Sequence, residues 1–443
     1  MQTQRITDLK NVIEQLLEEA KLQGATAAEA GLSVDDGLSV TARLGAVETI
    51  EHHYSQGLGV TVYFGNRKGV ASTTDLSSES IKETVNAACS IARYTSEDDC
   101  AGLPDTDLLA TEFPNLDLYH PWELSSEKAI EMAIDCENAA RFYHANISNS
   151  EGATVSTHKG ISVLGNSLGF LQARQSSRHS LSCSVLAQLG NDMQRDYWYS
   201  VARNAEFLES PKEVGEIAAE RTIRRLGGRS LSPRQCPVLF SAEIASSLLG
   251  SFVGAISGGS LYRKSTFLLD ALNTQIFPSF IHIHEQPHLI GGLGSSMYDS
   301  EGVATKHRDL VRGGILQDYV LSTYSARKLG LKSTGNAGGV RNLTITPTAG
   351  NFESMLQSLG TGLLVTELMG QGVKMVTGDY SRGAAGFWVE NGVIQYPVEE
   401  ITIAGNLKNM FENIVAVGND VDLRGNTRTG SILIEQMSIA GND

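Results

Sequence analysis

One short segment of the sequence has the spacing of a catalytic serine motif. Gly165-Asn166-Ser167-Leu168-Gly169 matches Gly-x-Ser-x-Gly, the nucleophile elbow of serine hydrolases. That motif works only at a turn from a strand into a helix, because this turn exposes the serine hydroxyl. Residues 170–175 that follow have the composition of another strand. We therefore interpret the segment as a hairpin turn between two strands.

A second segment carries the densest group of metal-ligand side chains. His282 and His284 would share one face of a strand, an arrangement that a metal site can use, and His288 follows closely. The alternative is a surface strand that carries histidines without binding a metal, and Pro287 indicates that such a strand ends there. Both interpretations stay open from the sequence.

A third segment places one carboxylate at the start of a predicted helix. Residues 241–249 contain small and apolar residues around Glu243, and they follow the strand-like run 237–240. Taken alone, this segment predicts a helix that packs through its small residues.

The elements that would position these residues begin with a pattern that occurs twice. Helical spacing of apolar residues covers 5–24 and 77–95, and again 125–144 and 211–226. The last of these helices begins with a capping box, Ser210-Pro211-Lys212-Glu213. Between the helices of each pair, short strands are separated by turn signals at Asp36-Gly37, Leu44-Gly45 and Gly65-Asn66, then at Glu151-Gly152, Lys159-Gly160 and Gly165-Asn166.

The second part of the chain has a different character. Glycine pairs and strand-like runs become frequent after about residue 236, and helices are predicted only over 242–256, 352–359 and 406–416. The Gly/Ser/Pro-containing segment 227–233 is the expected linker. We predict an α+β protein. Its N-terminal region, 1–226, is a duplicated helix–β-meander–helix unit with repeats at about 1–105 and 110–226, and a β-rich C-terminal domain follows at 234–443.

Composition narrows the classes of function. The formal net charge is −15, and the sequence has no basic stripe, which argues against direct nucleic-acid binding. No window approaches the roughly 20 apolar residues of a membrane span, and the N-terminus lacks the apolar core of a signal peptide. The five cysteines form no Cys-x-x-Cys pair, so neither a disulfide framework nor a thiolate zinc site is predicted. We expect a soluble cytoplasmic protein.

Long motifs in the C-terminal half then identify a family. They lie at 254–270, 299–303, 324–335, 366–372, 378–392, 403–407 and 417–420, and two of them read Asp299-Ser-Glu-Gly-Val303 and Thr366-Glu-Leu-Met-Gly-Gln-Gly372. Together they resemble the PmbA (TldE) branch of the TldD/PmbA metalloprotease family. The resemblance covers the C-terminal domain almost from end to end, and the N-terminal half is compatible with it.

The resemblance implies a protease of two different subunits. The TldD-type subunit carries His-Glu-x-x-x-His on a helix and a distant cysteine, which together bind a catalytic zinc. In this sequence Ala242, Ser247 and Gly430 occupy the ligand positions, and only Glu243 matches the motif. Alanine and glycine have no side-chain donor, and a neutral serine hydroxyl is a poor zinc ligand. We therefore expect no metal cofactor in this chain, zinc in a TldD-type partner, and a structural or vestigial Glu243.

The resemblance also implies the substrates and the partners. It predicts hydrolysis of unfolded or extended peptides, as in peptide-antibiotic precursor processing and antitoxin degradation, by a heterodimer with a TldD-type subunit. An alternative is a non-catalytic regulatory or binding protein that acts as a homodimer. A weaker alternative is a self-sufficient hydrolase that uses the histidines at 282, 284 and 288.

One glycine-rich segment, 378–388, is our candidate for the pairing interface or peptide contact. Tyr380, Arg382 and Trp388 are residue types that dominate interface hot spots, and the glycines beside them allow close backbone contact. The alternative is that the aromatic rings fill the core while Arg382 braces a turn.

Overall fold

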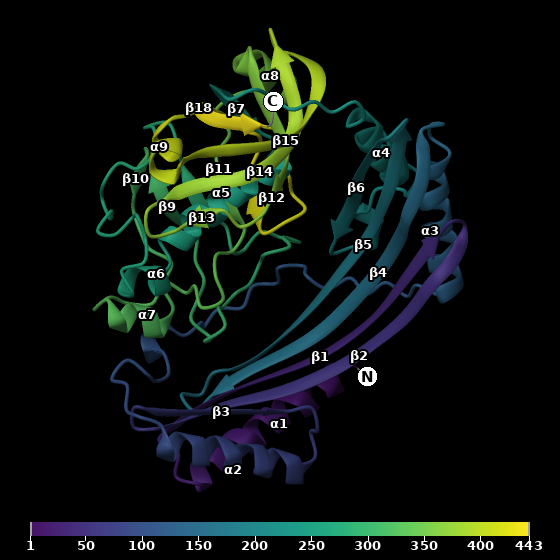
Figure 1. Ribbon diagram of the computed structural model, residues 1–443. Helices are drawn as coiled ribbons and strands as arrows, with labels where there is room; N and C mark the ends of the chain where they lie inside the picture. Colours follow the sequence, from purple (N-terminus) through teal and green to yellow (C-terminus); the bar gives the residue numbers. More distant parts are fainter. Residues whose placement is uncertain (1, 442–443) are drawn as a thin grey trace.

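A computed structural model describes residues 2–441 and combines one long curved sheet with a β-rich C-terminal part (Figure 1). The predicted α+β class and the β-rich C-terminal part are confirmed. Among the described residues, no helix is both long and apolar enough to cross a lipid bilayer.

The long sheet is antiparallel and has the strand order β3-β2-β1-β4-β5-β6. Two three-stranded halves meet where β1 pairs with β4, for example at Val34 and Ile161. The strands are β1 (Ala27–Arg43), β2 (Ala46–Phe64), β3 (Arg67–Thr73), β4 (Ile147–Asn166), β5 (Leu171–Leu189) and β6 (Asp192–Ala202).

Four helices cover one face of this sheet. Alternate residues of β1 are buried because they pack against α1 and α2 at one end and against α3 and α4 at the other. Figure 1 shows these helices outside the curve of the sheet, with the C-terminal part on the inner side. The four predicted helices are confirmed as α1 (Gln2–Leu22), α2 (Ser78–Tyr94), α3 (Ser126–Arg141) and α4 (Pro211–Arg224), and α4 begins with the expected capping box.

Several predicted turns are wrong, because the strands are much longer than expected. Gly37 lies in the middle of β1, and Gly152 and Gly160 lie inside β4. These glycines allow close backbone approach rather than a turn: a Cβ at Gly37 or at Gly152 would lie 2.7 Å from a carbonyl oxygen of the neighbouring strand. The turns at Leu44-Gly45 and Gly65-Asn66 are confirmed as the hairpins β1–β2 and β2–β3.

The serine motif is the hairpin turn that the sequence indicated. The Asn166 carboxamide accepts hydrogen bonds from the backbone N–H groups of Leu168 (3.0 Å) and Phe170 (3.3 Å), which shapes the turn between β4 and β5. The Ser167 hydroxyl accepts a hydrogen bond from the Ala28 N–H at 3.0 Å. Since no helix follows, this serine has no nucleophile-elbow geometry.

The C-terminal part contains a ring of strands and a second sheet. The ring β12-β7-β18-β15-β14 closes because β12 also pairs with β14, and β13 and β16 attach to it. It is formed by β7 (Arg234–Phe240), β12 (Gly362–Met369), β13 (Val373–Lys374), β14 (Asp379–Glu390), β15 (Val393–Asn406), β16 (Ile414–Val417) and β18 (Ile432–Gly441). The second sheet, in the order β10-β9-β8-β11-β17, consists of β8 (Ile283–Glu285), β9 (Arg308–Arg312), β10 (Ile315–Leu316), β11 (Leu343–Ile345) and β17 (Thr427–Arg428).

Short helices complete this part. The predicted helices at 242–256, 352–359 and 406–416 are confirmed, although the last is shorter than expected. The helices are α5 (Ala242–Ala255), α6 (Gly258–Tyr262), α7 (Thr323–Lys328), α8 (Phe352–Leu359) and α9 (Leu407–Glu412), with single 3₁₀ turns earlier in the chain at Thr106–Leu108 and Ala205–Phe207.

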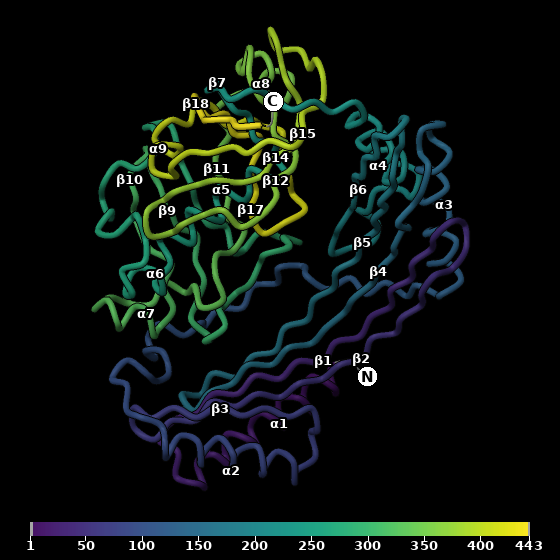
Figure 2. Tube along the Cα trace, viewed as in Figure 1, coloured from purple at the N-terminus to yellow at the C-terminus, as the bar shows by residue number. Residues whose placement is uncertain are grey.

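The segment between α2 and α3 ties the long sheet to the C-terminal part. In Figure 2 it runs past α7 before it returns to α3. Along this path Asp98 accepts hydrogen bonds from the Tyr324 hydroxyl (2.7 Å) and the Lys328 ammonium (2.9 Å). The Ala110 N–H donates to the Gly302 carbonyl at 3.0 Å.

Candidate functional site

Helix α5 points its first turn into a cavity between the long sheet and the C-terminal part. Its apolar residues, among them Ala245, Leu248 and Phe252, recur at helical spacing and are buried in the core. Ala242 and Glu243 lie in the first turn and line the cavity. The predicted strand–helix order around Glu243 is therefore confirmed.

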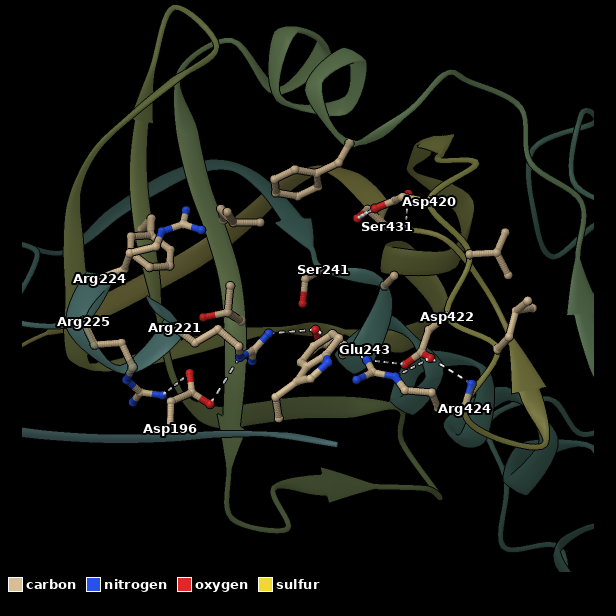
Figure 3. A pocket seen from close by; sticks show the side chains of 18 of the residues that line it. Asp196, Arg221, Arg224, Arg225, Ser241, Glu243, Asp420, Asp422, Arg424 and Ser431 are labelled. Atoms are coloured by element: carbon tan, nitrogen blue, oxygen red, sulfur yellow. Dashed lines mark hydrogen bonds and ion pairs between the residues drawn. The ribbon is translucent and has the colours of Figure 1, made fainter. Parts of the chain in front are cut away.

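The cavity has a volume of about 510 Å³ and is lined by charged and aromatic side chains (Figure 3). Its walls come from β6, α4, the first turn of α5, the ring strands β12 and β14, α8 and the loop after β16. Segments separated by more than 200 residues thus meet at one place. The lining residues include Asp196, Trp198, Glu209, Arg221, Arg224, Arg225, Ser241, Glu243, Phe352, Leu364, Phe387, Asp420, Asp422 and Arg424.

Glu243 joins two arginines that come from different parts of the chain. Its Oε1 atom accepts a hydrogen bond from Arg221 Nη1 of α4 at 2.8 Å and lies 3.6 Å from Arg424 Nη2. Each arginine has a second carboxylate, because Arg221 Nε lies 3.5 Å from Asp196 Oδ1 and Arg424 Nε lies 2.9 Å from Asp422 Oδ1. Glu243 therefore forms part of a network of ion pairs that holds the long sheet against the C-terminal part.

Trp198 lies between the same two arginines. The Arg424 guanidinium is 3.9 Å from the centre of the Trp198 ring, and that of Arg221 is 5.1 Å away. The indole N–H donates to Glu209 Oε2 at 2.7 Å. These cation–π contacts and hydrogen bonds fix the side chains on this wall of the cavity.

Comparison with known proteins identifies the family. Models of the first, central and C-terminal domains of PmbA/TldA metallopeptidases match residues 28–92, 119–226 and 233–441. The chain belongs to the PmbA/TldD metallopeptidase family. Metalloprotease PmbA of Escherichia coli O157:H7 is 55% identical over 414 residues, covering 94% of this chain and 92% of that protein.

Two further proteins match nearly the whole chain. A metalloprotease PmbA homologue of Haemophilus influenzae is 49% identical over 436 residues, covering 98% of this chain and 96% of that protein. A crystal structure from Bacteroides thetaiotaomicron, of a protein named as a candidate modulator of DNA gyrase, has a TM-score of 0.93 at 27% identity. It covers 98% of this chain and 99% of that one. The PmbA-type assignment made from the sequence is confirmed.

The positions that would hold zinc in a TldD-type chain do not fit a metal here. Ala242 offers no donor, and the Ser247 hydroxyl donates to the Ile244 carbonyl of its own helix at 2.6 Å. At Gly430, a Cβ atom would lie 2.0 Å from the Gly418 carbonyl oxygen, so a cysteine requires a shift of the backbone. Within residues 2–441, no group of three or more His, Cys, Asp and Glu side chains is arranged to hold a metal ion.

The three histidines of the sequence analysis are not brought together into one site. His284 lies in β8, and its ring lies beside that of His307, with centroids 5.5 Å apart. Burial lowers the pKa of His284, and the neighbouring His307 lowers it further. His282 Nδ1 accepts a hydrogen bond from the Gly313 N–H at 3.4 Å. His288 Nε2 lies 3.1 Å from the Thr305 hydroxyl, and burial lowers the pKa of His288.

The interface candidate lies largely inside the C-terminal core. Tyr380 and Trp388 are 2% and 6% exposed and belong to the main hydrophobic cluster, whereas Arg382 is half-buried. Burial raises the pKa of Tyr380 to about 12. The two rings thus occupy the position described by the core-filling alternative.

Sequence reasoning missed most of the cavity wall. Arg221, Arg424 and Trp198 were not singled out, although the last turn of α4 carries an arginine cluster that is visible in the sequence. Such a cluster usually indicates helix capping or a solvated surface. Its pairing with a loop about 200 residues later could not be read from local spacing.

Proposed function

We propose that this chain is the non-metal-binding subunit of a heterodimeric metallopeptidase that hydrolyses unfolded or extended peptides. The observation that carries the proposal is the set Ala242, Ser247 and Gly430 at the ligand positions, in a chain 55% identical to a protein named metalloprotease PmbA. A TldD-type subunit would supply the zinc and the chemistry of hydrolysis. Peptide-antibiotic precursors and antitoxins are the proposed substrates.

In the heterodimer, this chain would stabilise the TldD-type subunit rather than carry out the chemistry. Glu243 is bound by two arginines and has no neighbouring metal ligand, so it lacks the metal-bound water that a general base would activate. The free thiols of all five cysteines, four of them buried, fit the reducing cytoplasm that we propose as the compartment.

The surface that best fits a partner chain is the free edge of β2. Strand β3 pairs with residues 58–64. Within the part of the chain that the structure describes, residues 46–55 have no strand beside them on that side and are exposed on both faces. Val47 (42% exposed), Ile50 (45%) and Tyr54 (63%) contribute apolar surface there. A long, open and partly apolar strand edge is a template for pairing with another chain.

The proposed occupant of this edge is the TldD-type subunit. Because that chain belongs to the same family, we expect it to carry an equivalent strand, and two such edges can pair antiparallel. The alternative function, a regulatory homodimer, would use the same edge for a second copy.

Metal analysis and peptide cleavage test the proposal. The chain is purified alone and together with a TldD-type subunit. We expect about one zinc per heterodimer and cleavage of an unfolded peptide only by the pair. A chain that holds stoichiometric zinc and cleaves peptide by itself would contradict the proposal. A chain that never co-purifies with the TldD-type subunit would favour the homodimer.

The β2 edge is tested with the double variant Val47→Lys and Ile50→Lys. Both side chains are exposed, so the fold should be unaffected, but added charge on an edge opposes strand pairing. Co-purification should be lost. The control is Val70→Lys in β3, which is 52% exposed in the same sheet and should pair normally. Normal pairing of the double variant would exclude this edge as the interface.

A further inference from the structure

The cavity at α5 contains three charged groups that have no oppositely charged partner. Asp196 pairs with Arg221 and Arg225. Glu243 pairs with Arg221 and Arg424, and Arg424 also pairs with Asp422. Among the described residues, Arg224 has no carboxylate partner, and Glu209 and Asp420 have no cation. Ion pairing within the wall thus leaves one positive and two negative groups facing the cavity.

Arg224 and Asp420 each contact a neutral neighbour. The Arg224 guanidinium lies 5.2 Å from the centre of the Phe387 ring. Asp420 accepts hydrogen bonds from both the N–H (3.0 Å) and the hydroxyl (2.5 Å) of Ser431. Figure 3 shows Arg224 and Asp420 on opposite sides of the cavity, with Ser241 between them. Opposite charges therefore lie apart from one another, with Asp420 fixed by two hydrogen bonds and Arg224 on an exposed side chain.

Ser241 supplies a third polar point. Its hydroxyl oxygen is buried and has no hydrogen-bond partner among residues 2–441. Although Ser241 precedes α5, its side chain does not cap the helix. A buried hydroxyl without a partner costs free energy, and a ligand that bonds to it recovers this loss.

The rest of the wall is apolar. Phe352, Leu364 and Phe387 line the cavity, and its volume of about 510 Å³ lies within the range of ligand pockets, about 300–1,000 Å³. A ligand that fits this lining has an anionic end, a cationic end, a polar centre and apolar side groups.

We propose that this cavity binds a short apolar peptide, such as a dipeptide, with both termini free. The terminal carboxylate pairs with Arg224, the terminal ammonium pairs with Asp420, and the peptide unit between them hydrogen-bonds to the Ser241 hydroxyl. The side chains pack on Phe352, Leu364 and Phe387. Peptide binding would need only this chain, without a partner subunit or a metal. It can therefore be tested independently of the proposed heterodimer.

Calorimetric titration of the full chain with leucyl-leucine tests the proposal. The dipeptide should bind saturably, and both leucyl-leucine amide and N-acetyl-leucyl-leucine should bind at least about tenfold more weakly, because each has lost one charge-assisted contact. Equal affinity for the free and blocked peptides, or no saturation up to about 10 mM, would overturn the proposal.

Two variants assign the ends of the peptide. Arg224→Gln should weaken leucyl-leucine at least about tenfold and remove its advantage over the amide, while Asp420→Asn should remove its advantage over the acetylated peptide. Lys212→Gln, an exposed change in the same helix as Arg224, is the matched control and should bind like the wild type. Because Asp420 also holds Ser431, the thermal midpoint of each variant is measured. If folded Arg224→Gln still distinguishes the free peptide from the amide, the assigned orientation is wrong.

Discussion

Two glutamates of the C-terminal part, Glu285 and Glu243, are both bound by arginine but occupy different environments. Glu285 in β8 is 2% exposed, and four hydrogen bonds surround its carboxylate: one from Arg308 Nε (2.7 Å), two from Asn336 Nδ2 (3.0 and 3.1 Å) and one from the Arg341 N–H (2.7 Å). Glu243 has 30% of its side chain exposed, lies on a cavity wall and bonds only to side chains from distant segments.

The buried glutamate contributes to stability, whereas the glutamate of the family motif lies on a cavity wall. Glu285 joins neighbouring strands and loops of one sheet, and its charge is neutralised where water does not reach. Glu243 occupies the motif position of the family, yet both arginines that bind it have other carboxylate partners. We therefore expect the buried network of Glu285 to control folding, and Glu243 to be replaceable.

The largest effect is expected for Arg308→Ala. Arg308 also donates to Asp318 Oδ2 (2.7 Å) and Asn336 Oδ1 (2.6 Å), so its removal leaves a buried carboxylate without its cation. Loss of one partner of a buried ion pair costs about 3–5 kcal/mol, which urea denaturation will measure. The control is Arg312→Ala in the same strand, because the Arg312 side chain is 67% exposed and its pair with the partly buried Asp309 should contribute less than about 1 kcal/mol. If both variants lose the same stability, the buried network is not what distinguishes Glu285.

A smaller effect is expected at Asp299, a buried carboxylate that forms no ion pair with any described residue. Its oxygens accept hydrogen bonds from the N–H groups of Glu301 (2.9 Å), Val303 (3.0 Å) and Ala337 (2.9 Å). Burial raises the pKa of Asp299 from 3.8 to about 6. Between these two pKa values, the folded state holds a proton that the unfolded state has lost. The stabilisation that this proton provides is complete below pH 3.8 and is lost as the pH rises through about 6.

The pH dependence can be isolated with Asp299→Asn, which does not titrate. The unfolding free energy of the wild type minus that of the variant should be about 1.4 kcal/mol higher at pH 5 than at pH 8. Urea denaturation at the two pH values measures it. A difference that is independent of pH, or larger at pH 8, would show that burial does not raise this pKa.

Local sequence patterns predicted the helices well because their signals are local. The capping box at Ser210 and the apolar spacing of α5 depend on neighbours within one turn, and both are present in the structure. Two of the long strands, β1 and β4, were divided into shorter ones because glycine within a strand was read as a turn. Whether Gly37 ends a strand or allows close contact depends on the strand paired beside it, which local sequence does not specify.

The candidate site was predictable only in part, for a related reason. Glu243 was found through resemblance to the family, but its partner Arg424 lies 181 positions later in the chain, and no periodicity links them. Trp388 was singled out because its residue type is common at interfaces, whereas the same type is common in cores. The Trp388 side chain lies inside only because the strands around it close into a ring.

The smallest effect is expected for Glu243→Gln. Glutamine keeps the shape of the side chain and one acceptor oxygen for Arg221, while Asp196 and Asp422 still neutralise the two arginines. We expect a loss of less than about 1 kcal/mol in unfolding free energy. Peptide cleavage by the reconstituted heterodimer should stay within about threefold of the wild type, since removal of an essential general base costs about 10²–10⁴-fold.

Glu353→Gln, which changes an exposed glutamate in the first turn of α8, is the matched control. A hundredfold loss of cleavage in a folded Glu243→Gln heterodimer, with the control unaffected, would show that this glutamate takes part in catalysis. The comparison of the two glutamates would then separate a structural carboxylate from a catalytic one.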